Sequence, residues 1–162
     1  MNPKVIIGID PGDVHTGVCA LSLDEEQKIS MILEQTFDDR FQFLAWFKDE
    51  TSSWGMFDLD SPYDKTEHYV VVEDWRLFNT TEFKSNDRII AVRVIGMVEA
   101  VLGREPYYQM PGIKVPTEIH LGHLLPAKMR PDIKIFKQTQ HSKDAALHAL
   151  HFCHKILGIA LC

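Results

Sequence analysis

The sequence has few cysteines and no long hydrophobic run. Its 162 residues contain three cysteines, Cys19, Cys153 and Cys162, at no spacing typical of a metal-binding motif. No apolar run approaches the roughly 18 residues that a membrane span requires, and the N-terminus lacks the basic and long apolar regions of a signal peptide. We therefore expect reduced thiols, a cytoplasmic location, no membrane partner and a single domain over residues 1–162.

The sequence also lacks internal repeats, low-complexity tracts and an excess of positive charge. A net charge of −6 argues at first against a nucleic-acid partner. The charges are unevenly distributed, however: residues 1–83 carry 6 Lys and Arg against 17 Asp and Glu, and residues 84–162 carry 11 against 6. This asymmetry indicates either a polyanion-binding face on the second half of the chain or uneven surface decoration.

The first twenty residues contain a polar group where an apolar strand ends. The run over residues 5–9 is apolar and β-branched, Asp10 closes it, and a Pro-Gly turn separates it from a second apolar run that begins at Val18. This pattern predicts a β-hairpin. A carboxylate in such a place is costly to bury without a partner. Asp10 therefore either faces a cleft and holds something positive or caps the turn through its own backbone.

A second β-branched run, over residues 68–72, also ends in a carboxylate, Glu73. If this run forms a central strand beside the first, Glu73 comes close to Asp10. Two buried strands that end in this way predict a metal site.

Hydrophobic periodicity and capping residues predict the other elements. They are a strand over 29–37, a helix from Asp38 to about Lys48, a polar loop over 51–66, a helix over 87–102, a connection over 104–112, a strand over 113–119, a basic loop or short helix over 120–137, and a helix over 141–152. The helix at 38–48 should bury Phe41, Phe43, Leu44 and Phe47. The helix at 87–102 is apolar on more than one face, which predicts either a homodimer interface or deep burial within one chain.

The C-terminal helix carries two groups of polar side chains. His141 and Asp144, at positions i and i+3, lie on one face of the start of the helix. His148, His151 and His154 recur at intervals of three. These three form either a second metal cluster or, as we expect, a half-exposed stripe.

Three motifs now stand in order along the chain. They are Gly-Ile-Asp-Pro-Gly-x-x-x-Thr-Gly from Gly8, Val-Val-Glu ending at Glu73, and His-x-x-Asp-Ala-Ala-x-x-Ala from His141. The set resembles the RuvC-like Holliday junction resolvases of the ribonuclease H-like nucleases, over nearly the whole chain. The stretch from residue 72 to residue 76 and the acidic loop at 51–66 look more like the divergent versions encoded by bacteriophages.

The resemblance implies an α/β fold with a mixed five-stranded sheet, in which a three-strand antiparallel meander is joined by parallel strands and flanked by helices. It also implies that Asp10, Glu73, His141 and Asp144 are both the catalytic residues and the metal ligands. These oxygen ligands with one imidazole suit two Mg²⁺ ions per site, with Mn²⁺ as an alternative. Asp10 would bridge the ions, and His141 would be a ligand or orient the attacking water.

The activity implied is resolution of four-way DNA junctions by a homodimer. Two-metal hydrolysis of phosphodiesters would leave 5′-phosphate and 3′-hydroxyl ends. Aromatic and basic side chains would contact the DNA. The candidates are Trp75, Arg76, Phe78, Lys128, Arg130, Lys137 and Lys143. The alternatives are that Trp75 and Phe78 tuck under their loop and that the basic run is a solvated surface.

Three other functions compete. Gly-Ile-Asp-x-Gly also opens the phosphate loop of actin-like ATPases and sugar kinases, which need two such domains and further glycine-rich loops. A nuclease of the same fold could instead act on RNA, RNA–DNA hybrids or branched DNA in general. A non-catalytic junction-binding module could also have kept the fold.

Overall fold

The structure, a computed structural model, describes residues 2–12, 14–53, 66–74, 87–126 and 137–160. Its centre is one five-stranded sheet, and the strands lie in the order β3-β2-β1-β4-β5. They are β1 (Lys4–Pro11), β2 (Thr16–Leu23), β3 (Ile29–Phe37), β4 (Glu67–Glu73) and β5 (Tyr107–Gln109). The first three are antiparallel, and β4 and β5 run parallel to β1. This mixed sheet confirms the predicted fold class.

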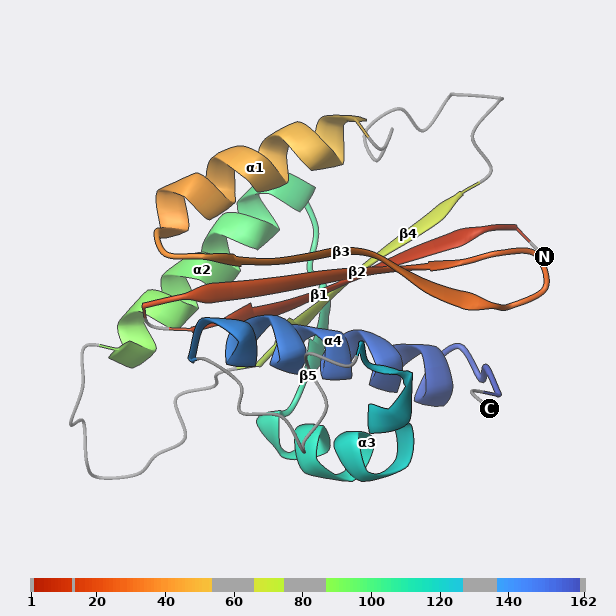
Figure 1. Cartoon of the computed structure of the whole chain (residues 1–162). Coiled ribbons are helices and arrows are strands. Elements are labelled where there is room, and N and C mark those ends of the chain that lie inside the picture. The colour runs from red at the N-terminus through yellow and green to blue at the C-terminus, as the bar shows by residue number, and fades with distance from the viewer. Residues whose placement is uncertain (1, 13, 54–65, 75–86, 127–136, 161–162) are drawn as a thin grey trace.

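Helices cover both faces of the sheet (Figure 1). One face carries α1 (Arg40–Ser53) and α2 (Asp87–Leu102), and the other carries α3 (Lys114–Leu121) and α4 (Lys137–Lys155). Two short 3-10 helices, Pro111–Ile113 and Gly122–Leu124, flank α3. None of the helices in the described ranges has the length and apolar character needed to cross a bilayer.

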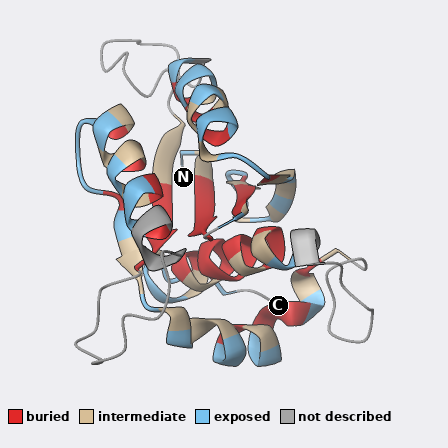
Figure 2. Cartoon of the chain, turned by 90° about the vertical axis from the view of Figure 1, so that its left-hand side faces the viewer, coloured by how far each residue is buried: buried red, intermediate tan, exposed pale blue. Residues whose placement is uncertain are grey.

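Alternating side chains of the strands build two hydrophobic clusters, one on each face. Ile7, Ile9 and Val72 face α1 and α2, whereas Ile6, Leu21 and other strand residues face α4. Figure 2 shows that the buried residues lie on the strands and on the facing sides of the helices, and that the exposed ones lie on the outer turns. This is the period-two pattern that a sheet covered on both faces requires.

The helix α1 begins where the sequence predicted and ends later. The Asp39 Oδ1 accepts a hydrogen bond from the backbone N–H of Phe41 at 3.0 Å, so Asp39 caps the helix. Its rings at 43 and 47 are buried, as expected, but Phe41 is 58% exposed and the Arg40 guanidinium lies over its ring. The prediction for Phe41 was wrong because two helical steps rotate a side chain by about 200°, away from the face that Phe43 shares. The helix runs to Ser53, so three residues of the predicted loop at 51–66 are helical.

The helix α2 has the predicted bounds, and Gly103, with φ +63°, follows its end. Its buried side faces the sheet through Val94, Val98 and Leu102. Val92 is 41% exposed on the opposite side. The expectation that the chain itself buries α2 on two sides is therefore wrong.

The predicted strand over 113–119 does not exist. The fifth strand is instead a three-residue segment, Tyr107–Gln109, inside the predicted connection, and residues 114–121 form α3. Pro116 explains the difference, because proline lacks the N–H that a ladder needs but fits the first turn of a helix, where N–H groups have no intrahelical partner. A three-residue strand is too short to give a periodic signal.

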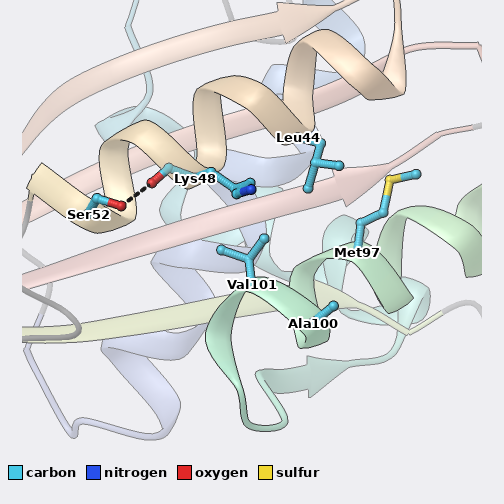
Figure 3. A pocket seen from close by; sticks show the side chains of 6 residues that line it. All are labelled: Leu44, Lys48, Ser52, Met97, Ala100 and Val101. Atoms are coloured by element: carbon cyan, nitrogen blue, oxygen red, sulfur yellow. Dashed lines mark hydrogen bonds between the residues drawn. The ribbon is translucent and has the colours of Figure 1, made fainter.

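A pocket of about 370 Å³ opens between α1 and α2, on the face of the sheet opposite α4 (Figure 3). Its wall is mostly apolar. The lining residues are Leu44, Lys48, Ser52, Met97, Ala100 and Val101. The Ser52 hydroxyl donates a hydrogen bond to the backbone oxygen of Lys48 at 2.7 Å. This hydroxyl proton is therefore already used within the helix.

Candidate active site

Two carboxylates lie side by side at the carboxyl ends of neighbouring parallel strands. The register pairs Ile9 of β1 with Val72 of β4, so Asp10 and Glu73 follow at the same edge of the sheet. Both are buried, with 2% of Asp10 and 0% of Glu73 exposed. The proximity predicted from the two strand endings is confirmed.

The helix α4 brings its polar residues to this edge by lying directly on the backbone of the first two strands. A Cβ atom on Gly17 would lie 2.1 Å from the backbone carbonyl of His141, and one on Gly8 would lie 2.0 Å from the backbone oxygen of Ala145. Both distances are far below van der Waals contact. These two glycines of the first motif therefore let the third motif reach the site.

His141 and Asp10 make direct contact. The Nδ1 atom of His141 lies 2.6 Å from Oδ2 of Asp10. The ring of His15 packs beside that of His141, with centroids 5.8 Å apart, and its own Nδ1 lies 2.8 Å from Oδ1 of Asp38. The imidazole of His141 is thus held between a buried carboxylate and a second histidine.

Asp144 reaches the site from one turn further along α4, and a lysine joins it to Glu73. The Lys114 Nζ lies 2.9 Å from Oδ2 of Asp144, and 3.1 and 3.2 Å from the two carboxylate oxygens of Glu73. Gln140 Nε2 donates to the other oxygen of Asp144 at 2.6 Å. The four predicted side chains therefore meet, with the Lys114 ammonium group between two of them.

The sequence prediction missed Lys114. Its segment was assigned to a strand, and nothing in the sequence separates this lysine from the other basic residues of the second half. In the structure it is the first residue of α3, and Thr117 on the same helix contacts His151 of α4 through Oγ1 and Nδ1 at 3.1 Å. Contacts between α3 and α4 thus hold the ammonium group in place.

Burial and neighbouring charges separate the pKa values of the two strand-end carboxylates. Burial raises the pKa of Asp10 to about 7, and the Glu73 carboxylate adds to that rise, while the bond to His141 opposes it. Burial would also raise the pKa of Glu73, but the nearby imidazole of His148, a hydrogen bond from Asp10 and the charge of Lys114 outweigh the effect of burial and lower this pKa to about 2. Glu73 is therefore the ionised partner, and Asp10 holds a proton up to neutral pH.

Lys114 responds to the same charges in the opposite direction. Burial works against its charged form, but Asp10, Asp144 and Glu73 raise its pKa above the ordinary lysine value. The ammonium group therefore stays protonated and offsets the negative charge that the site gathers.

The donor chemistry fits a hard divalent cation, although the part of the chain that the structure describes holds no preformed group of ligands. Within the described ranges no three His, Cys, Asp or Glu side chains are arranged to hold a metal ion together. The Lys114 ammonium group already places a positive charge between the carboxylates of Glu73 and Asp144. Carboxylate oxygens are the ligands that Mg²⁺ prefers, so the residues fit such an ion if Lys114 shares them or moves.

The candidate DNA contacts are only partly within the described residues. Trp75, Arg76, Phe78, Lys128 and Arg130 lie outside them, and Lys137 begins α4 with a side chain that is not described. Lys143 is described, and it differs from the expectation of an open basic side chain. It is 5% exposed and forms an ion pair with Glu118 of α3.

The three further histidines of α4 have separate partners. His148 is fully buried against Glu73, His151 contacts Thr117, and His154 shares a hydrogen bond with the backbone oxygen of Ile159. The expected half-exposed stripe is correct for His151 and His154 and wrong for His148. His148 comes one turn after Asp144, which turns it toward the site rather than toward solvent.

Comparison with known proteins gives a likeness in structure alone. No protein-family model matches the sequence, and no curated protein matches it significantly. Solved structures do match, among them RuvC of T. thermophilus in complex with a Holliday junction substrate, at 18% identity and a TM-score of 0.59, and the Thermus thermophilus RuvC structure, at 15% and 0.53. Each of these two matches covers 95% of this chain and 96% of the other. The chain therefore has the fold of RuvC, as the resemblance of its motifs predicted.

Proposed function

We propose that the protein is a metal-dependent endonuclease that resolves four-way DNA junctions and leaves 5′-phosphate and 3′-hydroxyl ends. One observation carries the proposal. Asp10, Glu73, His141 and Asp144 come from three segments that are far apart in the sequence, and they meet at one edge of a sheet with the RuvC fold. Such convergence of buried polar groups is expected at a reactive site.

Asp10, Glu73 and Asp144 would hold the divalent ions, and Asp10 would be shared because it stands between Glu73 and His141. When bound, two such ions supply an activated water and stabilise the leaving oxygen of a phosphodiester. Mg²⁺ is the expected metal, and Mn²⁺ should replace it.

His141 and Lys114 complete the chemistry from the side of the protein. The imidazole of His141 is a quarter exposed and holds or accepts a proton at Nδ1, next to Asp10. It would act as a ligand or orient the attacking water, and in either role Asp10 fixes its ring. The ammonium group of Lys114 offsets part of the negative charge of two carboxylates, which lowers the repulsion that a DNA phosphate meets.

The contacts with DNA and the assembly remain part of the proposal. The aromatic and basic residues expected to meet DNA are Trp75, Arg76, Phe78, Lys128, Arg130 and Lys137, whereas the buried Lys143 is no longer among them. Symmetric cutting of a four-way junction needs two active sites, so we propose a homodimer. The exposure of Val92 on the outer side of α2 supports this. Light scattering coupled to size-exclusion chromatography measures the mass directly.

The deciding experiment is cleavage of a synthetic four-way DNA junction with Mg²⁺, with Mn²⁺ and with chelator. The variants are Asp10→Asn and Asp144→Asn, and the matched control is Asp49→Asn, because Asp49 is an exposed carboxylate of α1. We expect paired, metal-dependent nicks from the wild type and the control. Both site variants should lose cleavage and keep most of their junction binding.

Other substrates separate the alternatives. Flaps, three-way junctions and RNA–DNA hybrids, tested beside the four-way junction, would identify a broader nuclease if they are cut and the junction is not. Tight binding without any metal-dependent cutting would identify a junction-binding module. Cleavage that survives Asp10→Asn would refute the site itself.

A further inference from the structure

A buried imidazole lies directly behind the proposed metal ligand Glu73. His148 of α4 is fully buried, and its Nε2 atom lies 3.6 Å from Oε2 of Glu73, which is fully buried as well. The distance is longer than that of a hydrogen bond. Lys114 contacts the same carboxylate at 3.1 and 3.2 Å. Glu73 thus contacts a partly exposed cation and a fully buried ring.

The other nitrogen of His148 is anchored to the neighbouring strand. Its Nδ1 lies 3.0 Å from Oε1 of Gln109, the last residue of β5. The backbone oxygen of Gln109 also accepts a 2.7 Å hydrogen bond from the N–H of Asp74, and the register pairs Gln109 with Glu73. One residue of β5 therefore fixes both the end of β4 and the ring that faces its carboxylate.

The orientation of the Gln109 amide decides which nitrogen of a neutral His148 ring carries the proton. If Gln109 Oε1 accepts from the N–H group at Nδ1, Nε2 has no proton and turns its lone pair toward the carboxylate. If the amide is turned by 180°, Gln109 Nε2 donates to Nδ1, and the single ring proton lies on Nε2. Among the described residues neither Gln109 Nε2 nor His148 Nε2 has another hydrogen-bond partner. Only the turned amide places the N–H group of a neutral ring toward Glu73, and a carboxylate beside Nε2 favours that arrangement over a lone pair.

We propose that His148, fixed by Gln109, is a positioning residue that sets the orientation of the Glu73 carboxylate for metal binding. A ligand that is held from behind loses less freedom when it binds an ion, and such outer contacts typically change metal affinity by about 10–100-fold. His148 touches neither the substrate nor the ion and acts only through Glu73. The inference rests on the proposed function, because it assigns Glu73 to the metal site.

The test measures binding of Mn²⁺ alone, without DNA, by electron paramagnetic resonance of the free ion. The variants are His148→Leu, which keeps an apolar side chain of similar size, and His148→Gln, whose amide can still donate toward Glu73. The control is His154→Leu, because His154 lies further along α4 and bonds to the backbone oxygen of Ile159. We expect about tenfold weaker binding for His148→Leu, binding within about threefold of the wild type for His148→Gln, and unchanged binding for the control.

Thermal unfolding in chelator separates positioning from a purely structural role. A structural histidine would lower the metal-free Tm in both His148 variants and leave the Mn²⁺ affinity unchanged, and that result would overturn the inference. If His148→Leu does not fold, Gln109→Leu takes its place. That variant frees the ring of His148 and should also weaken Mn²⁺ binding, whereas an unchanged affinity would again overturn the inference.

The same data distinguish a failure of the inference from a failure of the proposed function. If Asp10→Asn abolishes Mn²⁺ binding while both His148→Leu and Gln109→Leu bind like the wild type, the metal site stands and the role of His148 falls. If the wild type binds no Mn²⁺, the metal site and the inference fall together.

Discussion

The two faces of the sheet are packed in different ways. On the side of α1 and α2 the core is built from large rings, and those of Phe43 and Phe47 stack with centroids 5.5 Å apart. On the side of α4 the helix presents Ala145, Ala146 and Ala149 to the strands, and glycines of β1 and β2 meet its backbone. Both faces are buried, but small residues let the backbone of α4 touch the sheet, whereas rings lie between the sheet and α1.

The difference explains why the candidate site lies on one face only. Small residues let the backbone of α4 touch the sheet, so that side chains of the helix reach the strand ends where Asp10 and Glu73 lie. On the other face, large rings lie between the sheet and α1, and a pocket opens between α1 and α2. A site that needs several groups within about 3 Å of one another depends on the first kind of packing.

The largest effect is expected from adding bulk to the close-packed face. Gly17→Val would place a branched side chain where the His141 carbonyl lies 2.1 Å from a Cβ atom. Because backbone cannot move aside cheaply, we expect a loss of about 4 kcal/mol or more in the free energy of unfolding and no cleavage in the folded fraction. Urea denaturation measures the first and junction cleavage the second. A free energy of unfolding within about 1 kcal/mol of the wild type would show that α4 can move away from the sheet at little cost.

The second largest loss of stability is expected from removing the cation of the site. Lys114→Met removes the cation between Glu73 and Asp144 and leaves two largely buried carboxylates without it. We expect a loss of about 3 kcal/mol in the metal-free protein and a larger recovery on addition of Mg²⁺ than in the wild type. Thermal unfolding with and without Mg²⁺ measures both. Lys48→Met, an exposed lysine of α1, is the control, and equal losses in the two variants would contradict the special role of Lys114.

Asp10 should make the metal-free stability depend on pH. Its folded pKa of about 7 lies above the ordinary value of 3.8, so the folded protein keeps a proton that the unfolded chain releases. The stability that this proton provides is full below pH 4 and is lost as the pH rises to 7, about 2 kcal/mol of it between pH 5 and 7. Glu73, with its pKa lowered to about 2, contributes above pH 4.5 and loses its contribution only in acid, outside this window.

Denaturation in chelator at pH 5, 6 and 7 measures the dependence, and Asp10→Asn should remove most of it. A wild-type stability that rises between pH 5 and 7, or a slope that survives Asp10→Asn, would show that Asp10 is already ionised in this range. Since the proton and the metal compete for the same carboxylate, Mn²⁺ should also bind more weakly at pH 6 than at pH 8.

The parts of the fold and site that the sequence predicted have strong local signals. Asp10 and Glu73 each end a β-branched run, and two such runs pair naturally in one sheet. His141 and Asp144 carry the spacing of a helix face. The ribonuclease H-like order of elements followed from these runs together with the caps at Asp39 and Gly103.

The parts that it missed depend on contacts between distant segments. Lys114 is in place only because α3 packs on α4, and the strand Tyr107–Gln109 is ordered by its neighbour β4 rather than by its own three residues. His148 is buried because it follows Asp144 by one turn on a helix that touches the sheet. No local pattern records these facts, since each depends on which segment becomes the neighbour.

The smallest effect is expected on the outer face of α2, on the side of the sheet that carries the large rings. Gly96 is exposed in the middle of the helix, and a Cβ atom there would meet nothing within 4 Å. Gly96→Ala should therefore stabilise the protein by about 0.5–1 kcal/mol through helix propensity, a rise in Tm of about 1–4 °C, with cleavage unchanged. In the proposed homodimer, exposed Val92, Gly96 and Ala100 would face the second copy, and the added methyl groups would then oppose association. A gain in Tm at low protein concentration that disappears at high concentration would therefore identify this face as the contact between subunits. A gain at both concentrations would show that this face stays exposed to solvent.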